Sequence, residues 1–469
     1  MLFVIDDELR NLAEIFHKKK SCLYIVGGFV RNKLLGVPDY LNLDIDLCSK
    51  SKPEEVEKIV KNTDFYVENV NNQFGVVKIR GKKGLYEHAT FRTEKYDFAG
   101  AHNPSNVEFI DNVEVDALRR DFRCNSVYYD IYKDELIDPL GGIEDIKNRI
   151  IRTTRDPKIV FNDDSERILR MVRQAVCLGF DIDENTYQRA KNNAFKVKLL
   201  SKTRIKKEFE KILLANAIYP CLENIQFGHA RGVLLLADLN ILGNIMPTLG
   251  KISKMNIIDD KGRNLFLHIV DTLKLCQEDD LVLRLSILVH DYGKAEALIK
   301  TGKFFGHEDL ANVLIEQDLG SEGLMYDKKT IKTIKQIVFA QDFDAYSLEH
   351  LTKVRKFIIE NYLQINNIIL LKKYISINKN NKIKFSIKKL IREKNKIESG
   401  VYPAGIDDLR LDGKDILELF PNMKNDKISE VLNKLLDICL KYGWKNKHDE
   451  LIKELDKIIK KNKKYYLEV

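Results

Sequence analysis

The chain has 469 residues with a formal net charge of +8 at pH 7, and hydrophobic and charged residues make up 44% and 32% of it. This composition is typical of a soluble globular protein, and the length predicts two to four domains. No run of about 18 uncharged apolar residues occurs, so we expect no transmembrane helix and no membrane partner.

The cysteines are scattered and form no CxxC pair, which argues against a disulfide framework and against a cysteine zinc site. Acidic residues follow the apolar start of the chain, a pattern unlike that of a secretory signal. Together these features predict a cytoplasmic protein. The mild basic charge permits a nucleic acid as a partner without requiring one.

Residues 1–152 mix predicted strands with helices, whereas helical periodicity dominates from residue 153 onward. The sequence therefore predicts an α+β fold that begins with a mixed-sheet head. A helical neck over 153–225, a helical body over 226–345 and a basic helical tail over 346–469 would follow. The oligomeric state is left open by this pattern.

In the head, a short apolar run that predicts a strand ends at Gly27 and Gly28, and a predicted helix follows. Two glycines allow a phosphate to approach the backbone at a helix N-terminus. Arg31 is placed one turn into that helix, where a guanidinium can bind phosphate oxygens. An ordinary tight turn beside a surface arginine is the alternative interpretation.

A second predicted strand carries Asp44 and Asp46, which would point to the same face because side chains alternate along a strand. Paired carboxylates suit Mg²⁺, and Glu87 on a later predicted strand is a candidate third ligand. Most such aspartate pairs are solvated. This pair follows a strand, a Gly-Gly turn and a helix, which favours a two-metal site for phosphoryl transfer.

In the neck, Asp164, Arg167 and Arg170 are spaced three apart in a predicted amphipathic helix that ends near Gly179. This spacing would place them on one helical face. An aspartate acceptor and an arginine donor together can match the hydrogen-bonding edges of both C and A. A salt-bridged surface stripe is the alternative interpretation.

Six motifs occur in one order: VGGFVRNKLLG, DID, TFRTE, RRDFRCNS, DPLGGIEDI and DDSERILRMVRQAVCLGF. Their order and spacing resemble those of bacterial class II tRNA nucleotidyltransferases, the CCA-adding enzymes of the bacterial poly(A) polymerase superfamily. The resemblance covers residues 20–215 strongly and continues more weakly toward the tail. It implies a head of the polymerase-beta-like nucleotidyltransferase fold.

The resemblance implies addition of CCA to the 3′ end of tRNA from CTP and ATP without a template, with Mg²⁺ as cofactor and pyrophosphate as product. Asp44 and Asp46 match the metal ligands of the family, and Gly28 and Arg31 match its triphosphate contacts. Ribose recognition falls on Arg119, Arg120, Asp121 and Asn125. Asp164 and Arg167 match the base-reading pair, and Arg170 and Arg173 match further nucleotide contacts.

The chain departs from the family pattern at several places, including a somewhat long spacing from the Gly-Gly turn to Asp44 and Asp46. Asn32 stands where an acidic residue is usual, and Asp163 replaces a glutamate. The flexible loop that helps such enzymes switch from C to A addition reads YDFAGAHNPSN over residues 96–106. These differences keep a poly(A) polymerase, or an enzyme that adds only CC or only A, as alternatives.

In the body, His268, the pair His290 and Asp291, and His307 lie in segments that resemble the HD phosphohydrolase superfamily. The resemblance implies a second divalent metal site and leaves an HD-domain phosphohydrolase as an alternative of another class. An inherited helical scaffold without a metal is the other interpretation.

In the tail, basic residues outnumber acidic ones between Lys372 and Lys396, with Tyr374 and Phe385 among them. Such a segment is suited to follow a phosphate backbone, with its aromatic rings stacked on bases. The tail also resembles the tRNA-binding domain of longer family members. A solvated lysine-rich surface and a non-catalytic RNA-binding protein are the alternatives.

Overall fold

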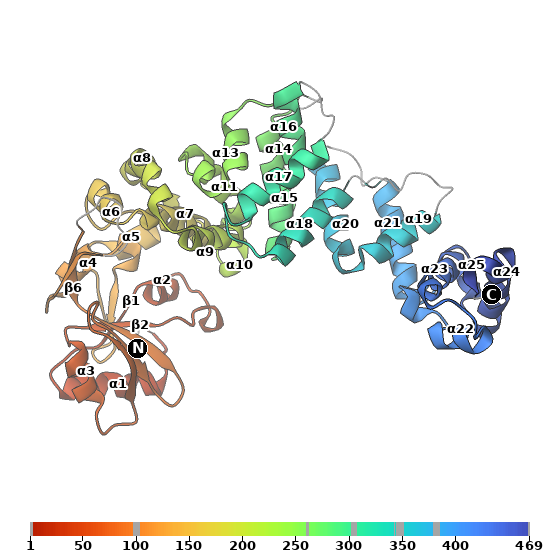
Figure 1. The fold of residues 1–469 in the computed structure, drawn as a ribbon. Coiled ribbons are helices and arrows are strands. Elements are labelled where there is room, and N and C mark those ends of the chain that lie inside the picture. Colours follow the sequence, from red (N-terminus) through yellow and green to blue (C-terminus); the bar gives the residue numbers. More distant parts are fainter. Residues whose placement is uncertain are drawn as a thin grey trace. The chain divides into compact units, whose positions relative to one another are not determined.

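The computed structural model describes residues 3–96, 104–258, 262–301, 307–341, 343, 351–378 and 385–467 (Figure 1). The chain forms two compact units. The first comprises Met1–Arg284 with Asp291–Lys328, and the second comprises Leu285–His290 with Lys329–Val469. The finer division into head, neck, body and tail stays a prediction, and most of the loop over 96–106 lies outside the described residues.

The predicted mixed-sheet head is confirmed. Among the described residues, its main sheet has the strand order β3-β4-β5-β2-β1-β8-β9, in which β2 and β5 are parallel and the other pairs are antiparallel. The strands are β1 (Tyr24–Val26), β2 (Asp46–Ser49), β3 (Tyr66–Asn71), β4 (Val76–Arg80), β5 (Leu85–Thr90), β8 (Tyr128–Asp130) and β9 (Glu135–Ile137).

A small sheet and five helices complete the described part of the head, and a second small sheet joins it to the predicted neck. Strands β6 (Arg92–Lys95) and β7 (Asn106–Phe109) pair antiparallel, and β10 (Ile150–Ile151) pairs in parallel with β11 (Asp181–Ile182). The head helices within the described residues are α1 (Asp7–Lys18), α2 (Gly28–Leu34), α3 (Pro53–Val60), α4 (Val113–Leu118) and α5 (Gly142–Lys147).

The two faces of the main sheet have different environments. His88 of β5 is fully buried, and its ring centroid lies 5.8 Å from that of Phe16 in α1. Side chains alternate along a strand, so the neighbouring Glu87 points to the opposite face. On the neighbouring strand β2, Asp46 lies directly across from Glu87 and points to the same face. One face therefore packs on helices, and the other presents carboxylates.

The prediction that one strand carries both aspartates is wrong in detail, because β2 begins at Asp46 and Asp44 precedes it. Strand β1 has only three residues, which pair with Asp46, Leu47 and Cys48. The ladder offers no partner at the level of Asp44, so the strand starts two residues later than expected.

The predicted change to helices after the head is confirmed. In the described part of the first unit, these helices are α6 (Pro157–Asp163), α7 (Glu166–Leu178), α8 (Glu184–Asn193), α9 (Lys202–Leu213), α10 (Ala215–Ile218), α11 (Gly228–Asp238), α12 (Leu242–Ile245), α13 (Pro247–Lys254), α14 (Leu265–Leu275), α16 (Tyr292–Thr301) and α17 (His307–Leu319), while α15 (Leu281–Val289) contributes to both units.

Helix α7 is amphipathic and ends where Gly179 adopts a left-handed conformation with φ 68°, as the sequence predicts. The prediction that Asp164 shares this helix is wrong. Asp164 has extended backbone angles and precedes Ser165, the N-cap residue of α7. Its carboxylate accepts a hydrogen bond from the Glu166 backbone N–H at 2.9 Å, so it caps the helix from outside.

The described part of the second unit is helical throughout. Its helices are α18 (Lys328–Ala340), α19 (Leu351–Glu360), α20 (Ile365–Asn378), α21 (Phe385–Glu398), α22 (Gly413–Leu419), α23 (Asn425–Lys441), α24 (His448–Lys461) and α25 (Lys463–Tyr466). Tyr374 is only 5% exposed, so the prediction that its ring stacks on a base is wrong. Phe385 and Trp444 are 57% and 60% exposed and keep accessible rings.

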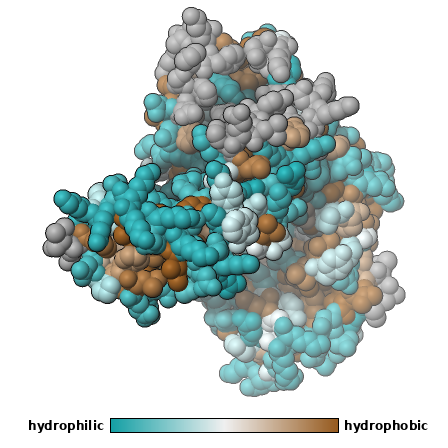
Figure 2. Space-filling model, turned by 90° about the vertical axis from the view of Figure 1, so that its right-hand side faces the viewer, coloured by the Kyte–Doolittle hydropathy of each residue, from teal (hydrophilic) through white to brown (hydrophobic). Residues whose placement is uncertain are grey.

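The surface fits the composition. Hydrophilic side chains cover much of the face drawn in Figure 2, with smaller hydrophobic patches between them. Among the described helices, none is both long enough and apolar enough to cross a bilayer.

Candidate nucleotide-binding site

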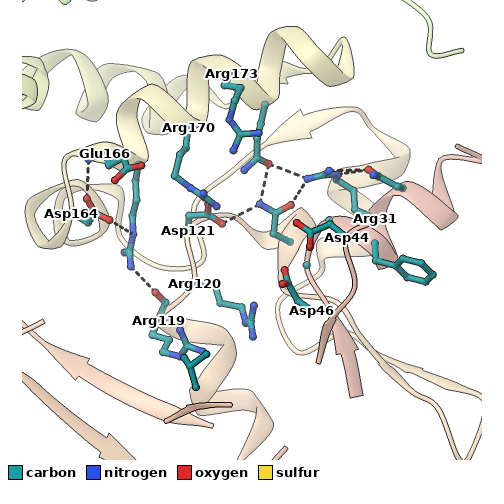
Figure 3. A pocket seen from close by; sticks show the side chains of 18 of the residues that line it. Arg31, Asp44, Asp46, Arg119, Arg120, Asp121, Asp164, Glu166, Arg170 and Arg173 are labelled. Carbon is teal, nitrogen blue, oxygen red and sulfur yellow. Dashed lines mark hydrogen bonds and ion pairs between the residues drawn. The ribbon is translucent and has the colours of Figure 1, made fainter. Parts of the chain in front are cut away.

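A cavity of about 1080 Å³ opens in the first unit, between the carboxylate-bearing face of the main sheet and helices α7 and α9. It is the setting of the predicted site (Figure 3). The predicted residues that line it are Gly27, Gly28, Arg31, Asp44, Asp46, Arg119, Arg120, Asp121, Asn125, Asp164, Arg167, Arg170 and Arg173. Glu87 is the predicted head residue that does not line it directly.

The Gly-Gly turn lies against a carboxylate. Gly27 has φ 85°, a backbone conformation that residues with a side chain rarely adopt. A Cβ at Gly27 would stand 3.4 Å from Oδ2 of Asp46. The turn therefore brings the start of α2 directly beside the aspartate at the start of β2.

Three carboxylates gather at this end of the sheet. Burial within the cavity raises the pKa of Asp46, as do the nearby charges of Asp44 and Glu87, while Arg120 acts in the opposite direction. A carboxylate whose pKa is raised by neighbouring negative charges is stabilised in its ionised form by a bound cation. The donors are all oxygen atoms, which is the ligand set that Mg²⁺ and other hard divalent cations prefer. The residues present therefore fit a divalent metal.

Arg31 is held by neutral oxygens. Its Nε and Nη2 donate to Oδ1 of Asn32 at 3.1 and 2.8 Å, and its Nη1 donates to Oδ1 of Asn125 at 2.6 Å and to Oε1 of Gln174 at 3.3 Å. Within the described residues, no carboxylate forms an ion pair with it. Its positive charge therefore remains available to an anion in the cavity.

The RRD segment is fixed by a buried acid that the sequence reasoning missed. Asp116 of α4 pairs with Arg119 at 2.8 Å and with Arg120 at 3.1 Å, and it accepts from the Tyr128 hydroxyl at 2.7 Å. Burial acts to raise the pKa of Asp116, but the two guanidinium groups dominate and lower it to about 2. Arg119 and Arg120 are thus oriented before any ligand binds.

Asp121 and Asn125 join the head to α7. Oδ2 of Asp121 accepts from Nε and Nη2 of Arg170 at 2.9 and 2.6 Å, and Oδ1 accepts from Nδ2 of Asn125 at 3.1 Å. Burial acts to raise the pKa of Asp121, but Arg170 and the Asn125 hydrogen bond outweigh it and lower the pKa. These contacts tie two sequence motifs that are 49 residues apart.

Asp164 and Arg167 form a buried polar pair at the other end of the cavity. Nε of Arg167 lies 4.0 Å from Oδ2 of Asp164, and its Nη2 donates to the Arg119 carbonyl at 2.9 Å. Figure 3 shows Asp164 beside Glu166, at the start of α7. The contact to Arg119 places a donor and an acceptor side by side in a fixed orientation.

Gln174 is a second residue that the sequence reasoning missed. Its Oε1 accepts from Nη1 of Arg31 and from Nδ2 of Asn125, the latter at 2.9 Å. It lies four residues after Arg170, one turn further along α7, so the helical spacing could have identified it. An amide on an amphipathic helix carries no charge pattern, however, and the quoted motifs do not single it out.

The predicted HD residues are described only in part. His268 of α14 and Asp291 are buried, with Nε2 and Oδ2 3.6 Å apart, and Lys294 donates to the other oxygen of Asp291 at 2.7 Å. His290 precedes Asp291 and is also buried. His307 begins α17, but its side chain lies outside the described residues. Their role as metal ligands stays a prediction.

Comparison with protein families gives two matches. Residues 23–152 match the family described as "Poly A polymerase head domain", and residues 179–252 match "Probable RNA and SrmB- binding site of polymerase A". The CCA-adding enzyme of Streptococcus thermophilus is 35% identical over 217 residues, or 46% of this chain and 52% of that protein. That of a Geobacillus species is 38% identical over 190 residues, or 40% and 45%.

The chain thus spans about half the length of the curated relatives it matches. Solved structures extend the likeness over the whole fold. A Bacillus stearothermophilus CCA-adding enzyme in complex with CTP matches with a TM-score of 0.66 and 21% identity, over 98% of both chains. The Thermotoga maritima enzyme complexed with tRNA matches with a TM-score of 0.57 and 20% identity, over 97% and 96%.

These matches confirm the fold class and the resemblance on which it was based. At these sequence identities the solved structures show similarity of the fold, and the family matches show similarity of two segments of the chain. Residues 23–152 match a poly(A) polymerase head domain, residues 179–252 match a probable RNA-binding site of polymerase A, and the fold of the whole chain is similar to that of the CCA-adding enzymes.

Proposed function

We propose that this protein adds CCA to the 3′ end of tRNA from CTP and ATP, without a template and with release of pyrophosphate. The observation that carries the proposal is that one cavity combines the carboxylates Asp44 and Asp46 with the donor–acceptor pair Asp164 and Arg167. The carboxylates suit phosphoryl transfer, and the pair suits selection of a base by hydrogen bonds. The curated relatives named above are CCA-adding enzymes.

Asp44 and Asp46, with Glu87 beside them, would hold two Mg²⁺ ions, which would activate the RNA 3′-hydroxyl and neutralise the pyrophosphate when bound. The protein's own contribution is binding and orientation, which supply most of the catalysis in phosphoryl transfer. Arg31 would hold the triphosphate, because its charge has no carboxylate partner among the described residues. Asp121 and Asn125, which lie close to Arg31 and α7, would contact the ribose of the incoming nucleotide.

Asp164 and Arg167 would select the base. An aspartate oxygen accepts from the exocyclic amine that C and A both carry, and a guanidinium donates to the adjacent ring nitrogen. Uracil and guanine reverse this pattern at the corresponding edge. The hydrogen bond from Arg167 to the Arg119 carbonyl holds the pair in register with the RRD segment.

The first test uses a tRNA transcript without its 3′ CCA, with Mg²⁺ and labelled CTP or ATP, and products resolved at single-nucleotide length. We expect two C and one A, followed by a stop, and no addition by Asp44→Ala. Lys191→Ala, which removes an ion pair with Asp238 between two residues that do not line the cavity, is the matched control and should remain active. A long ladder with ATP alone would instead identify a poly(A) polymerase, and a stop after CC or A alone would identify a partial enzyme.

An HD-domain phosphohydrolase remains the alternative of another class, with a second divalent metal at His268, His290, Asp291 and His307. The ion pair between Lys294 and Asp291 competes with a metal for one carboxylate oxygen, which favours the transferase. Phosphatase activity on a generic phosphomonoester, lost in Asp291→Ala and retained in Asp44→Ala, would support the alternative.

The proposed setting is the cytoplasm, because all the cysteines are free thiols. Within the second unit, the exposed rings of Phe385 and Trp444 and the exposed cations Lys388 and Arg392 of α21 are the proposed tRNA contacts.

A further inference from the structure

Beside the carboxylates, the main sheet carries a row of polar residues that the nucleotide contacts leave unused. Across the ladder, Asp46 of β2 faces Glu87 of β5, Glu87 faces Lys78 of β4, and Lys78 faces Asn69 of β3. Directly opposed residues on neighbouring strands project from the same face of a sheet. The row therefore extends the carboxylate-bearing face away from β1.

We propose that Lys78, with Asn69 and Asn71 beside it, forms the subsite for the 3′-terminal nucleotide of the RNA primer, and that Lys78 binds the last phosphodiester of that RNA. This proposal rests on the proposed function and names the place where its second substrate binds.

The first argument is the order of the strands. Strand β1 and helix α2, with Gly27, Gly28 and Arg31, lie on one side of β2, while β5, β4 and β3 lie on the other. The attacking and leaving oxygens of a phosphoryl transfer are roughly in line with each other. If Arg31 holds the triphosphate on the β1 side, the RNA hydroxyl must approach from the β5 side. The row from Glu87 to Asn69 begins there.

The second argument is access to the cavity. Asn69, Asn71 and Lys78 all line the same cavity as Asp44 and Asp46. Each of the three is exposed. Strands lie about 4.8 Å apart, so Lys78, two strands from Asp46, lies about 10 Å from it along the ladder. That separation is comparable to one nucleotide of extended RNA together with the reach of a lysine side chain.

The third argument is charge. Arg92, Arg119, Arg120, Arg170 and Arg173 line the cavity but are already paired with Glu94, Asp116, Asp121 or Glu208. Lys78 has no ion pair with any described residue, although Glu87 stands directly across the ladder from it. An uncompensated cation beside neutral amides suits a single phosphodiester group. A triphosphate would call for a stronger cluster of positive charge.

The fourth argument is an aromatic ring at the end of the row. Phe74, in the turn between β3 and β4, lines the same cavity and is half-buried. Its carbonyl accepts from Nη1 of Arg92 at 2.5 Å, which fixes the turn. A ring in this place can stack on a base of any sequence, as a primer site requires for tRNAs that differ in the nucleotide before CCA.

The test measures Lys78→Ala on a tRNA that ends in CC, with ATP, and determines KM for the RNA and for ATP separately. We expect the RNA KM to rise about tenfold and the ATP KM to change less than twofold. Loss of one phosphate contact should also lower the slope of log KM for the RNA against log salt concentration by about 0.7. Lys78→Arg keeps the charge and should restore the RNA KM.

The matched control is Lys58→Ala, because Lys58 is an exposed lysine of the head in α3 that does not line the cavity. The decisive probe is the same tRNA with a neutral methylphosphonate as its last internucleotide linkage. The wild type should lose on this RNA what Lys78→Ala loses on normal RNA, and the variant should lose nothing further.

The outcomes separate the two proposals. If the wild type extends no RNA, the proposed function fails and the subsite fails with it. If the wild type extends RNA but Lys78→Ala keeps a normal RNA KM, only the subsite is overturned. A raised ATP KM, or additive losses for the variant and the neutral linkage, would likewise overturn it and assign Lys78 to another ligand.

Discussion

At the scale of single residues, the cavity contains two kinds of arginine: some form ion pairs with carboxylates, and one is bound by neutral oxygens. Arg170 and Arg173 each pair with a carboxylate at 2.6 Å, whereas Arg31 is surrounded by the amide oxygens of Asn32, Asn125 and Gln174. An amide oxygen orients a guanidinium without cancelling its charge. Arg31 is therefore both fixed and electrostatically available, which is the state that binding of a triphosphate requires.

Gln174 is the residue that tests this arrangement, because one oxygen accepts from both Arg31 and Asn125. We expect Gln174→Leu to leave both donors without that acceptor and to raise KM for CTP and ATP about tenfold. That factor corresponds to about 1.4 kcal/mol, the scale of one or two neutral hydrogen bonds. Because Gln174 positions other groups, kcat should fall less than KM rises.

The control for this prediction is Gln188→Leu, which removes an exposed hydrogen bond to Glu184 on α8 and should leave both constants unchanged. Steady-state kinetics with each nucleotide provides the measurement, and urea unfolding verifies that the variant remains folded. An unchanged nucleotide KM in folded Gln174→Leu would show that Arg31 holds its orientation without the glutamine.

At the scale of elements, alternation along β5 divides its side chains between two functions. Glu87 joins the carboxylates, while His88 is fully buried, with Ser49 Oγ 2.8 Å from its Nε2. Burial disfavours the charged imidazole and lowers the pKa of His88 to about 3. The strand therefore carries a titratable group in the core directly beside a residue of the site.

This burial predicts a pH dependence of stability. Between about pH 6.5, the ordinary pKa of histidine, and about pH 3, the unfolded chain binds a proton at His88 that the folded chain does not. Stability contributed by neutral His88 is therefore lost as pH falls through that window, by about 1.4 kcal/mol for each pH unit at most. From pH 6.5 to 4.5 the wild type should lose about 2 kcal/mol more than His88→Gln.

Urea unfolding followed by circular dichroism at pH 6.5, 5.5 and 4.5 provides this measurement. His17→Gln serves as the control substitution, because His17 lies on the exposed side of α1, outside the core. Parallel pH profiles for the wild type and His88→Gln would contradict the expected burial of a neutral imidazole.

The elements also show what the sequence could and could not predict. The Gly-Gly turn, the strand at Asp46, the strand of Glu87 and the end of α7 at Gly179 all follow from local signals, and the structure contains each of them. The start of β2 was misplaced because it depends on the length of β1, a partner in the ladder. Asp164 was misplaced because capping and continuation of a helix give similar residue patterns.

Contacts between distant segments were the least accessible to sequence reasoning. Asp116 orients the RRD segment and Gln174 joins α7 to α2, yet neither stands out by the charge pattern of its own segment. Their importance comes from partners that are distant in the chain, up to 143 residues in the case of Gln174 and Arg31. The resemblance to a family identified the residues that would touch the ligand but not those that hold them.

At the scale of the whole molecule, the second unit has a core of its own. Its helices bury two apolar clusters, one around Val354, Ile358 and Leu390 and one around Leu435, Leu451 and Leu455. Arg355 and Glu393 form a fully buried ion pair at 2.7 Å in this unit, and Arg355 also donates to the carbonyl of Leu440. Arg355 of α19 thus connects this helix to α21 through the ion pair and to α23 through the hydrogen bond.

This pair predicts how the second unit unfolds. Glu393→Leu would leave the Arg355 guanidinium buried without its counter-charge, at a cost of about 3–5 kcal/mol. Replacing both partners by apolar residues, Arg355→Met with Glu393→Leu, should recover most of that loss. Lys356→Ala, which removes an exposed ion pair with Asp437, is the control and should cost less than about 1 kcal/mol.

The chain contains a single tryptophan, Trp444, and it lies in the second unit. Tryptophan fluorescence during urea unfolding therefore reports on that unit, while circular dichroism reports on both. With Glu393→Leu, the fluorescence transition should move to lower urea, and kcat/KM for nucleotide addition to a short RNA primer should stay near that of the wild type. We expect addition to persist because the described residues that line the candidate nucleotide-binding cavity all belong to the first unit. Loss of nucleotide addition to that primer would show that the proposed activity depends on an intact second unit.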